Sequence, residues 1–278
     1  MPTLPKLIAL DLDRTLLPVD DHRIPEINLR ALRELHEAGV ALAVITGRRR
    51  TTLEPYMDQI GLPILASSNS GTQLWQLPDW TRLASKPLEH RLVEQAVSLL
   101  EPHSLNLYFE WDDEDPMDFA WLKRAESVLQ TRYFSEYGAR GGTIASLEEL
   151  PERQVLQLSM PGTEELVLEG KRTLETGLGD DVFAECVLWP RMPCHALEVF
   201  HPDGNKGWAL GRFAQLLGLD ISETMAVGDD ANDLPMLAAA GTAVAMGHSH
   251  PQALALASHV LPDNGEAELG RYLLSLLA

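Results

Sequence analysis

Cysteine and basic side chains are both scarce in this 278-residue sequence. Only two cysteines occur, Cys186 and Cys194, which are too few for a disulfide framework or a zinc cluster. The sequence holds 22 Lys and Arg against 41 Asp and Glu, which gives a formal net charge of −19. Proteins that coat nucleic acid bind its phosphates through Lys and Arg, so this balance argues against a nucleic-acid partner.

Long apolar segments are also absent. No apolar run approaches the roughly 18 residues of a membrane-spanning helix. The N-terminal MPTLPKL lacks the charged and apolar regions of a signal peptide. We therefore expect a cytoplasmic protein with no membrane partner, present as a monomer or a homodimer. The remaining composition, 45% hydrophobic and 23% charged residues, is typical of a globular protein with one large or two medium domains.

Short apolar runs alternate with helical patterns in the first 80 residues. The runs at 6–12, 40–48 and 62–71 are nearly continuous, which favours strands buried on both faces. Apolar residues at helical spacing fill 27–38, and a second helical segment follows the second run. This alternation of strands and helices predicts right-handed crossovers and a parallel, doubly wound α/β sheet.

The same alternation returns near the C-terminus. We expect helices over 207–218 and 232–241, strands over 224–230 and 242–247, and a helix at the chain end. Because these segments continue the pattern of the first part, both are assigned to one discontinuous core domain, residues 1–80 and 200–278.

Residues 81–199 have a different character. Helices are expected at 88–100, 119–130 and 163–175, and alternating segments occur at 105–111, 154–160 and 195–200. Alternation favours a sheet with one face covered by helices and the other face open. The segment is therefore predicted to be a separate α+β domain inserted into the core.

Four groups of polar residues fall where predicted strands end or helices begin. They are Asp11-Leu12-Asp13-Arg14-Thr15, Thr46-Gly47-Arg48, Lys206, and Gly228-Asp229-Asp230-Ala231-Asn232-Asp233. Each group alone has an ordinary explanation, such as a solvated turn or an acidic helix start. Open parallel sheets, however, bind ligands beyond the carboxyl ends of their strands. The four groups in this order therefore indicate one common site.

These motifs resemble those of the haloacid dehalogenase (HAD) superfamily, and the resemblance covers nearly the whole chain. DLDRTL matches the DxDxT first motif, TGR the second, Lys206 the third and GDDAND the fourth. The insertion between the second and third motifs, with LEVFHPDGNKGWAL leading to Lys206, resembles the Cof-like subfamily with a type IIB cap. The resemblance implies a Rossmann-like core, residues 81–199 as the cap domain, and phosphatase activity.

Phosphoryl transfer gives a physical reason for the two aspartates after the first strand. The Asp11 carboxylate can attack phosphorus and form an aspartyl phosphate, which divides the hydrolysis into two easier steps. Asp13 lies on the same side of an extended chain and can act as general acid and then as general base. Because two carboxylates repel a phosphate, we expect a divalent cation, and the oxygen ligands favour Mg²⁺.

The resemblance also implies roles for the remaining motif residues. The expected metal ligands are Asp11, the backbone carbonyl of Asp13, and Asp229, with Asp233 supporting the metal or Lys206. Lys206 is expected to offset the charge of Asp11 and of the phosphate. The expected phosphate and substrate contacts are Thr46, through its hydroxyl and backbone N–H, together with Gly47, Arg48, Asn232 and Asn69.

Some positions depart from the family pattern or leave their role open. Arg14 stands where the family has glycine, and its side chain reaches the cap or the substrate, or lies in solvent. The loop that commonly reads Asn-Gly in the family is Asn69-Ser70-Gly71 here, which weakens the assignment of Asn69. His248 and His250 in GHSHP resemble a metal-binding pair, but we expect no acidic ligand near them and therefore an ordinary loop.

The leading hypothesis is a Mg²⁺-dependent phosphatase that acts on small phosphate monoesters. Its partner would be a small phosphorylated metabolite, with sugar phosphates as the first candidates. Two alternatives remain open, a phosphomutase on the same scaffold and a non-enzymatic Mg²⁺-binding phosphoacceptor. A third reading, in which the acidic turns are inert, predicts no dependence on Mg²⁺.

Overall fold

The chain divides into two compact units in its computed structural model, a core unit (Met1–Ser85 with Asn205–Ala278) and a cap unit (Lys86–Gly204). The structure describes residues 4–18, 23–104, 106–111, 117–123, 127–137, 140–150, 154–189, 192, 194–262 and 268–278. The predicted domain boundaries at 80 and 200 fall a few residues before the observed ones. The first boundary lies later because strand β5 (Thr81–Ser85) pairs within the core sheet. None of the described helices is long and apolar enough to span a membrane.

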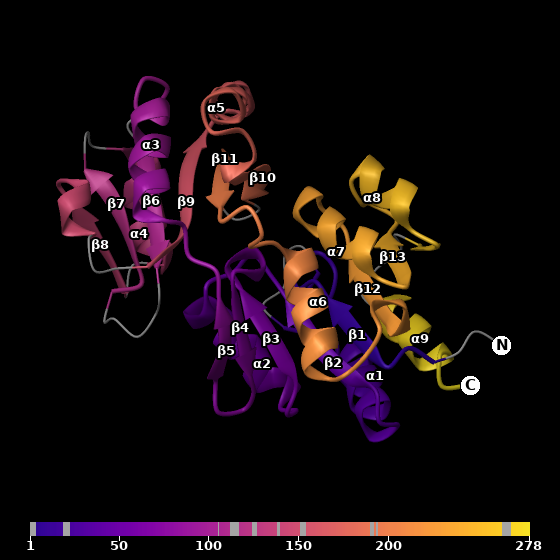
Figure 1. Ribbon diagram of the computed structural model, residues 1–278. Helices are drawn as coiled ribbons and strands as arrows, with labels where there is room; N and C mark the ends of the chain where they lie inside the picture. The colour runs from indigo at the N-terminus through magenta and orange to yellow at the C-terminus, as the bar shows by residue number, and fades with distance from the viewer. Residues whose placement is uncertain are drawn as a thin grey trace. The chain divides into compact units, whose positions relative to one another are not determined.

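The described strands of the core unit form one eight-stranded sheet (Figure 1). Besides β5, they are β1 (Leu7–Leu10), β2 (Ala41–Ile45), β3 (Leu65–Ser68), β4 (Gln73–Gln76), β12 (Thr224–Gly228), β13 (Thr242–Met246) and β14 (His259–Leu261). Their order is β14-β13-β12-β1-β2-β3-β4-β5. The strands from β14 to β3 are parallel, which confirms the predicted α/β fold class. β4 pairs antiparallel with β3 and β5, since the short turn Asn69–Gly71 allows no crossover.

Helices cover both faces of this sheet. Helices α1 (Glu26–Glu37), α2 (Arg50–Ile60) and α9 (Glu268–Ser275) pack on one face, and α6 (Lys206–Leu216), α7 (Leu234–Ala239) and α8 (Pro251–Leu256) pack on the other. Successive residues of β1 point to opposite faces, so Ile8 and Leu10 join the first cluster while Leu7 and Ala9 join the second. All four side chains are buried, which explains why this strand reads as a continuous apolar run.

The carboxyl edge of the core sheet gathers the predicted motifs. Asp11, Thr46, Asn69 and Asp229 each follow directly after the last residue of a strand, respectively β1, β2, β3 and β12. These four strands are neighbours in the order β12-β1-β2-β3. Parallel strands present their carboxyl ends at one edge, so residues far apart in the sequence meet there.

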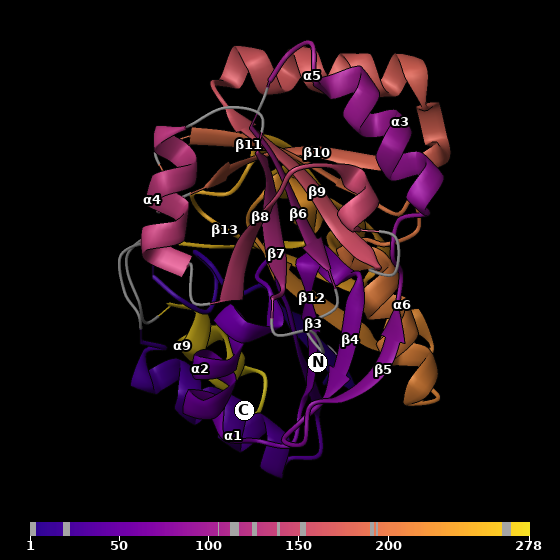
Figure 2. The ribbon, with the colours of Figure 1, turned by 90° about the vertical axis from the view of Figure 1, so that its left-hand side faces the viewer.

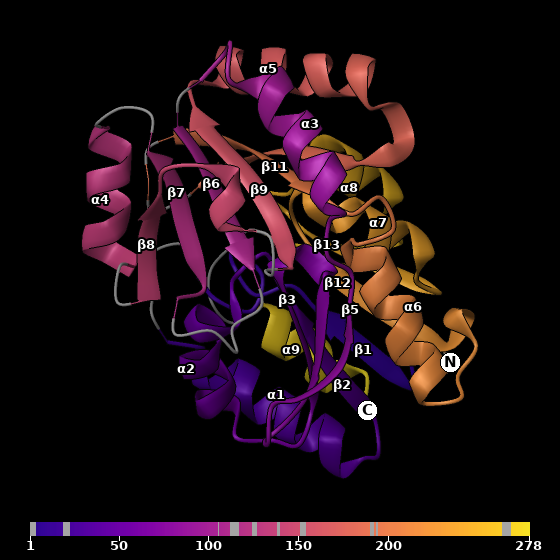
Figure 3. The same ribbon diagram turned by 60° about the vertical axis from the view of Figure 1, so that its left-hand side comes forward.

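The cap unit is a six-stranded sheet with helices. Its strands, in sheet order, are β10 (Phe183–Trp189), β11 (Cys194–Phe200), β9 (Val155–Gly162), β6 (Asn106–Trp111), β7 (Phe119–Lys123) and β8 (Gly141–Ile144). Helices α3 (His90–Leu100) and α5 (Glu164–Gly177) pack together on one face (Figures 2 and 3). The opposite face carries an aromatic cluster of Tyr108, Phe119 and Trp121 with Tyr133 of α4 (Val128–Tyr137).

The prediction of one helix over residues 119–130 is wrong. Residues 119–123 form strand β7, and helix α4 begins only at Val128. Phe119 and Trp121 point into the aromatic cluster while Ala120 and Leu122 point to the face of α3 and α5, so both faces are apolar. A strand that is buried on both faces shows no alternation of apolar and polar residues, and its short apolar run was therefore ambiguous.

Gly71 provides a test of how closely the motif loops approach one another. Its φ is +101°, and an added Cβ would lie 2.4 Å from the backbone C and O of Asn205 and 2.8 Å from the N of Lys206. Gly39 is a matched control, because its φ is +86° but nothing lies within 4 Å of the added Cβ. We expect Gly39→Ala to cost only the left-handed backbone penalty of about 1–2 kcal/mol.

The same substitution at Gly71 should cost about 1–3 kcal/mol more, since the backbone must move. Unfolding in urea, with circular dichroism as the readout, measures both variants. Equal losses of stability for Gly71→Ala and Gly39→Ala would show that this close approach does not constrain the fold.

Candidate active site

A buried ammonium group lies at the centre of the carboxyl edge. Lys206 is only 2% exposed, and its Nζ lies 2.5 Å from Asp11 Oδ1 and 2.6 Å from Asp233 Oδ1. Asn205 caps helix α6, because its side chain accepts a hydrogen bond from the backbone N–H of Trp208, and the helix therefore starts at Lys206. Burial alone would lower the pKa of this lysine, but the charges of Asp11 and Asp233 raise it, so the ammonium stays protonated.

Asp11 is a buried carboxylate surrounded by other carboxylates. Its residue is 5% exposed, and its pKa is raised well above the ordinary value by burial first and then by the charge of Asp233. Lys206 acts in the opposite direction, while Asp229 and Asp13 raise the pKa further. The local charge is therefore more negative than one lysine can balance, and an added cation would keep Asp11 ionised.

Asp229 presents one carboxylate oxygen that lacks a hydrogen-bond donor. Its Oδ1 accepts a hydrogen bond from Thr15 Oγ1 at 3.2 Å. Its Oδ2 has no hydrogen-bond partner among the described residues, although Arg14 Nη1 and His248 Nε2 each lie 3.5 Å away. Ligand atoms of Asp11, Asp229 and Asp233 lie within 4.8 Å of one another. Such oxygens suit a hard divalent cation, so the residues present fit the expected Mg²⁺.

The carboxylate of Asp233 is already committed to protein partners. Its Oδ1 accepts from Lys206, and its Oδ2 accepts from the backbone N–H groups of Asp229 and Asp230, at 2.8 and 3.0 Å. Gly228 is needed beside it, because an added Cβ would lie 2.6–2.7 Å from the Asp233 side chain. Asp233 therefore holds Lys206 and the turn after β12 in place, which fits the expected supporting role better than direct metal binding.

Asp13 is paired with Arg48. The Nε and Nη2 of Arg48 donate to Asp13 Oδ2 and Oδ1 at 2.8 and 2.6 Å, and the guanidinium also lies 4.6 Å from the centre of the Tyr56 ring. Burial would lower the pKa of Arg48, but its hydrogen bonds to Asp13 and the charge of Asp13 raise it. The sequence predicts that Arg48 contacts phosphate or substrate, whereas in the structure its side chain holds the second aspartate of the first motif.

The loop after β2 lies against the loop after β3. Thr46 Oγ1 accepts from the backbone N–H of Arg48 at 3.2 Å, and the hydroxyl proton is available to a ligand. The expectation that the Thr46 backbone N–H also binds phosphate is wrong, because this N–H donates to the carbonyl of Ser67 at 3.2 Å as a continuation of the sheet. An added Cβ at Gly47 would lie 3.3 Å from Ser70 Oγ and 3.6 Å from Asn232 Nδ2, so these two polar atoms face the same place.

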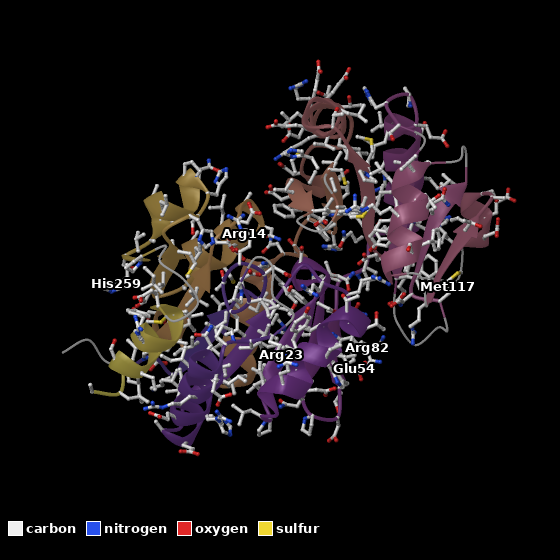
Figure 4. All side chains as sticks on the ribbon, turned by 180° about the vertical axis from the view of Figure 1, so that it is seen from behind. Arg14, Arg23, Glu54, Arg82, Met117 and His259 are labelled. Carbon is white, nitrogen blue, oxygen red and sulfur yellow. The ribbon has the colours of Figure 1, made fainter. Side chains whose placement is uncertain are left out.

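Three residues near the acidic cluster were not assigned from the sequence. Thr15 belongs to the first motif but had no expected role. Arg14 (labelled in Figure 4) lies beside Asp229 rather than in solvent, with φ of +64°. The expectation that no acidic group lies near His248 is wrong. Asp229 follows β12 and His248 follows β13, and because these strands are parallel neighbours, the two side chains lie close together. His250 instead caps helix α8 by accepting a hydrogen bond from Gln252 N.

Comparison with known proteins identifies the family. A family model described as haloacid dehalogenase-like hydrolase matches residues 8–273. The chain belongs to the haloacid dehalogenase-like hydrolases. This result confirms the HAD resemblance that the four motifs predicted.

Relatives and solved structures of HAD proteins match nearly the whole of this chain. The HMP-PP phosphatase of Cronobacter sakazakii is 29% identical, over 92% of this chain and 89% of the relative. The 5-amino-6-(5-phospho-D-ribitylamino)uracil phosphatase YitU of Bacillus subtilis is also 29% identical, over 98% of both chains.

A haloacid dehalogenase-like hydrolase from B. subtilis shares the fold with a TM-score of 0.80 at 24% identity, over 97% of this chain and 99% of that one. A HAD subclass IIB sugar phosphatase does so with a TM-score of 0.77 at 20% identity, over 97% and 98%. These findings support the predicted phosphatase with a type IIB cap.

Metal binding should stabilise this HAD hydrolase in a pH-dependent way. Because the folded-state pKa of Asp11 is raised, its contribution to stability without metal is complete below the ordinary aspartate pKa and is lost as the pH rises through the raised value. Mg²⁺ bound at this cluster would compete with the proton. We therefore expect Mg²⁺ to raise the thermal midpoint by a few degrees more at about pH 8 than at about pH 5.

Differential scanning fluorimetry, with EDTA as the reference, measures this shift. Asp229→Asn is the matched variant, because it keeps the size of the side chain and removes one charge from the cluster. A shift that is equal at both pH values, or is unchanged in Asp229→Asn, would remove these carboxylates from metal binding.

Arg14 should weaken metal binding through its charge. Its guanidinium lies 3.5 Å from Asp229 Oδ2, so Arg14→Ala should tighten Mg²⁺ binding by roughly three- to tenfold, which corresponds to a surface-pair energy of about 1 kcal/mol. Arg14→Gly should tighten it equally and also stabilise the fold, since glycine suits a φ of +64°. Titration calorimetry with Mg²⁺ tests this, with Arg14→Lys as the charge-preserving control. Affinity in Arg14→Ala that equals the wild-type value would contradict the electrostatic role of Arg14.

Proposed function

We propose that this HAD hydrolase is a Mg²⁺-dependent phosphatase of small phosphate monoesters that works through an aspartyl phosphate on Asp11. The observation that carries the proposal is the Asp11–Lys206–Asp233 cluster beside Asp229, at the carboxyl ends of β1 and β12. A buried carboxylate held by a buried ammonium is expensive to maintain for stability alone. Such a perturbed pair at a ligand-binding edge suits nucleophilic catalysis.

Asp11 and Lys206 would perform the first step. The Asp11 carboxylate attacks phosphorus, the P–O bond to the leaving group breaks, and the phosphoryl group stays on Asp11. Lys206 offsets negative charge on Asp11 and on the phosphoryl oxygens without changing its own protonation, because its pKa is raised. Asp11, Asp229 and the backbone carbonyl of Asp13 would hold Mg²⁺, which when bound supplies further positive charge near the phosphate.

Asp13 would handle the protons. It gives a proton to the leaving oxygen in the first step, and it later takes a proton from the water that attacks the aspartyl phosphate. Arg48 holds both oxygens of the ionised Asp13 carboxylate, so this contact would have to open for Asp13 to take up the proton that it gives to the leaving oxygen. The Thr46 hydroxyl and Asn232 would orient the phosphate. Asn69, which is buried in the turn after β3, would contact the substrate.

The substrate class is a small phosphorylated metabolite. The two curated relatives are named for phosphorylated compounds of this size, and one solved structure of the same fold is a sugar phosphatase. Sugar phosphates remain the first candidates, and phosphorylated pyrimidine derivatives belong beside them in any substrate panel.

Asp11→Asn should abolish phosphate release from every substrate, with a loss of at least about 1,000-fold, because the amide cannot act as a nucleophile. Asp13→Asn should also be nearly inactive, and it should retain one phosphoryl group on Asp11 because the attacking water lacks its base. Phosphate release from a metabolite panel with and without Mg²⁺ measures the first effect, and intact-protein mass spectrometry measures the second. Asp220→Asn serves as the control, since Asp220 caps a short turn before β12.

Two results would oppose this proposal. Substantial activity in Asp11→Asn would remove Asp11 as the nucleophile. Phosphate transfer between substrates without net release would favour a phosphomutase instead.

A further inference from the structure

The hydroxyl of Ser70 is buried beside the loop of the second motif without a hydrogen-bond partner. Ser70 is 1% exposed, and its Oγ has no partner among the residues that the structure describes. A buried hydroxyl loses its bonds to water on folding and normally regains them within the protein. An unpartnered hydroxyl in this position therefore requires an explanation, and a ligand is one.

The backbone at Ser70 is also unusual. Its φ of 52° and ψ of 29° place a non-glycine residue in the left-handed region, which costs free energy. Two backbone hydrogen bonds hold the turn there: Ser70 N donates to Thr46 O at 3.0 Å, and Asn69 N donates to Arg48 O at 2.9 Å. The turn after β3 is thus fastened directly to the Thr46–Arg48 loop, and a side chain is kept at a position that glycine would occupy with less strain.

The surroundings of Ser70 identify the kind of ligand. Gly47 lies beside two polar side-chain atoms, because a Cβ added to it would be 3.3 Å from Ser70 Oγ and 3.6 Å from Asn232 Nδ2. A hydroxyl and an amide N–H₂ group both donate hydrogen bonds, and the Thr46 hydroxyl is the neighbouring donor on the same loop. Several donor groups gathered around one glycine match an ionised phosphate, whose oxygens accept hydrogen bonds and donate none.

We propose that Ser70 binds the substrate phosphate of this enzyme, with its Oγ–H donating to a phosphoryl oxygen beside Gly47. This inference rests on the proposed phosphatase function and adds a residue that the four motifs do not include. Ser70 forms no bond to phosphorus and moves no proton, so it is a binding residue. The competing explanation is an ordered water molecule that satisfies the hydroxyl and has no relation to phosphate.

Two substitutions separate the hydroxyl from the backbone conformation. Ser70→Ala removes the hydroxyl and keeps a Cβ in the left-handed region. Ser70→Gly removes the hydroxyl and relieves the strain, so its thermal midpoint should equal or exceed that of the wild type. Ser258→Ala is the control, because Ser258 Oγ donates to the carbonyl of Ala243 beside β13, away from the carboxyl edge.

The probe is inorganic phosphate, added to the full-length protein with Mg²⁺. Its dissociation constant comes from titration calorimetry and from competitive inhibition of monoester hydrolysis. Because hydrogen bonds to charged groups are strong, we expect Ser70→Ala and Ser70→Gly each to weaken phosphate binding by about tenfold or more, and to raise KM more than they lower kcat. Ser258→Ala should bind phosphate as the wild type does.

The outcomes distinguish this inference from the proposed function. Phosphate affinity that is unchanged in Ser70→Ala would overturn the role of Ser70 while the phosphatase stands. Weakened binding in Ser70→Ala that Ser70→Gly restores would show that only the backbone matters, and would also overturn it. Wild-type protein that binds phosphate, loses this in both Ser70 variants and hydrolyses no monoester would support Ser70 and refute the phosphatase. Wild-type protein that does not bind phosphate would overturn the role of Ser70, and it would overturn the phosphatase as well if it hydrolysed no monoester.

Discussion

The buried ammonium of Lys206 between Asp11 and Asp233 is the interaction on which the core unit depends. It joins the first strand of the chain to a helix and a turn that follow the 119 residues of the cap unit, Lys86–Gly204. Removing one member of a buried ion pair leaves an uncompensated charge and typically costs about 3–5 kcal/mol. This contact therefore adds to the β1–β12 pairing in coupling the two segments of the core unit, and it also fixes the direction of the carboxylate that we propose as the nucleophile.

The distribution of the few basic residues follows from the acidity of the site. In a chain with a net charge of −19, Lys206, Arg48 and Arg14 each lie against an aspartate at the carboxyl edge. These cations reduce the repulsion among the carboxylates but do not remove it, because burial first, and then the charges of Asp233, Asp229 and Asp13, raise the pKa of Asp11. An anionic substrate can approach only where local positive charge outweighs this field, which is why a divalent cation and buried donors are both expected there.

The sequence allowed the strands and their motif residues to be predicted because both signals are local. A continuous apolar run predicts a parallel strand, and parallel strands bring Asp11, Thr46 and Asp229 to one edge whatever the loops do. Other contacts depend on how loops pack in three dimensions. They are the Arg48–Asp13 pair, the approach of His248 to Asp229, and the hydrogen bond from Thr46 N–H to the Ser67 carbonyl. No spacing in the sequence encodes these contacts. Strand β7 was missed for the opposite reason, since a short run that is apolar on both faces has no distinctive period.

Contacts at three glycines explain how these loops acquire a common geometry. Gly71 lies against the backbone of Asn205, Gly228 lies against the side chain of Asp233, and Gly47 lies beside Ser70 Oγ. At Gly71 the missing side chain lets the turn after β3 come closer to the backbone of Asn205 than a Cβ would permit, and at Gly228 it makes room for the Asp233 side chain. The backbone contact at Gly71 and the backbone hydrogen bonds of Asn69 and Ser70 to the Thr46–Arg48 loop hold the turn after β3 in place, so donors around Gly47 can hold their positions before a ligand arrives. The left-handed backbone at Ser70 fits this view, because strain at a preorganised site is tolerated when the orientation it secures would otherwise have to be created on binding.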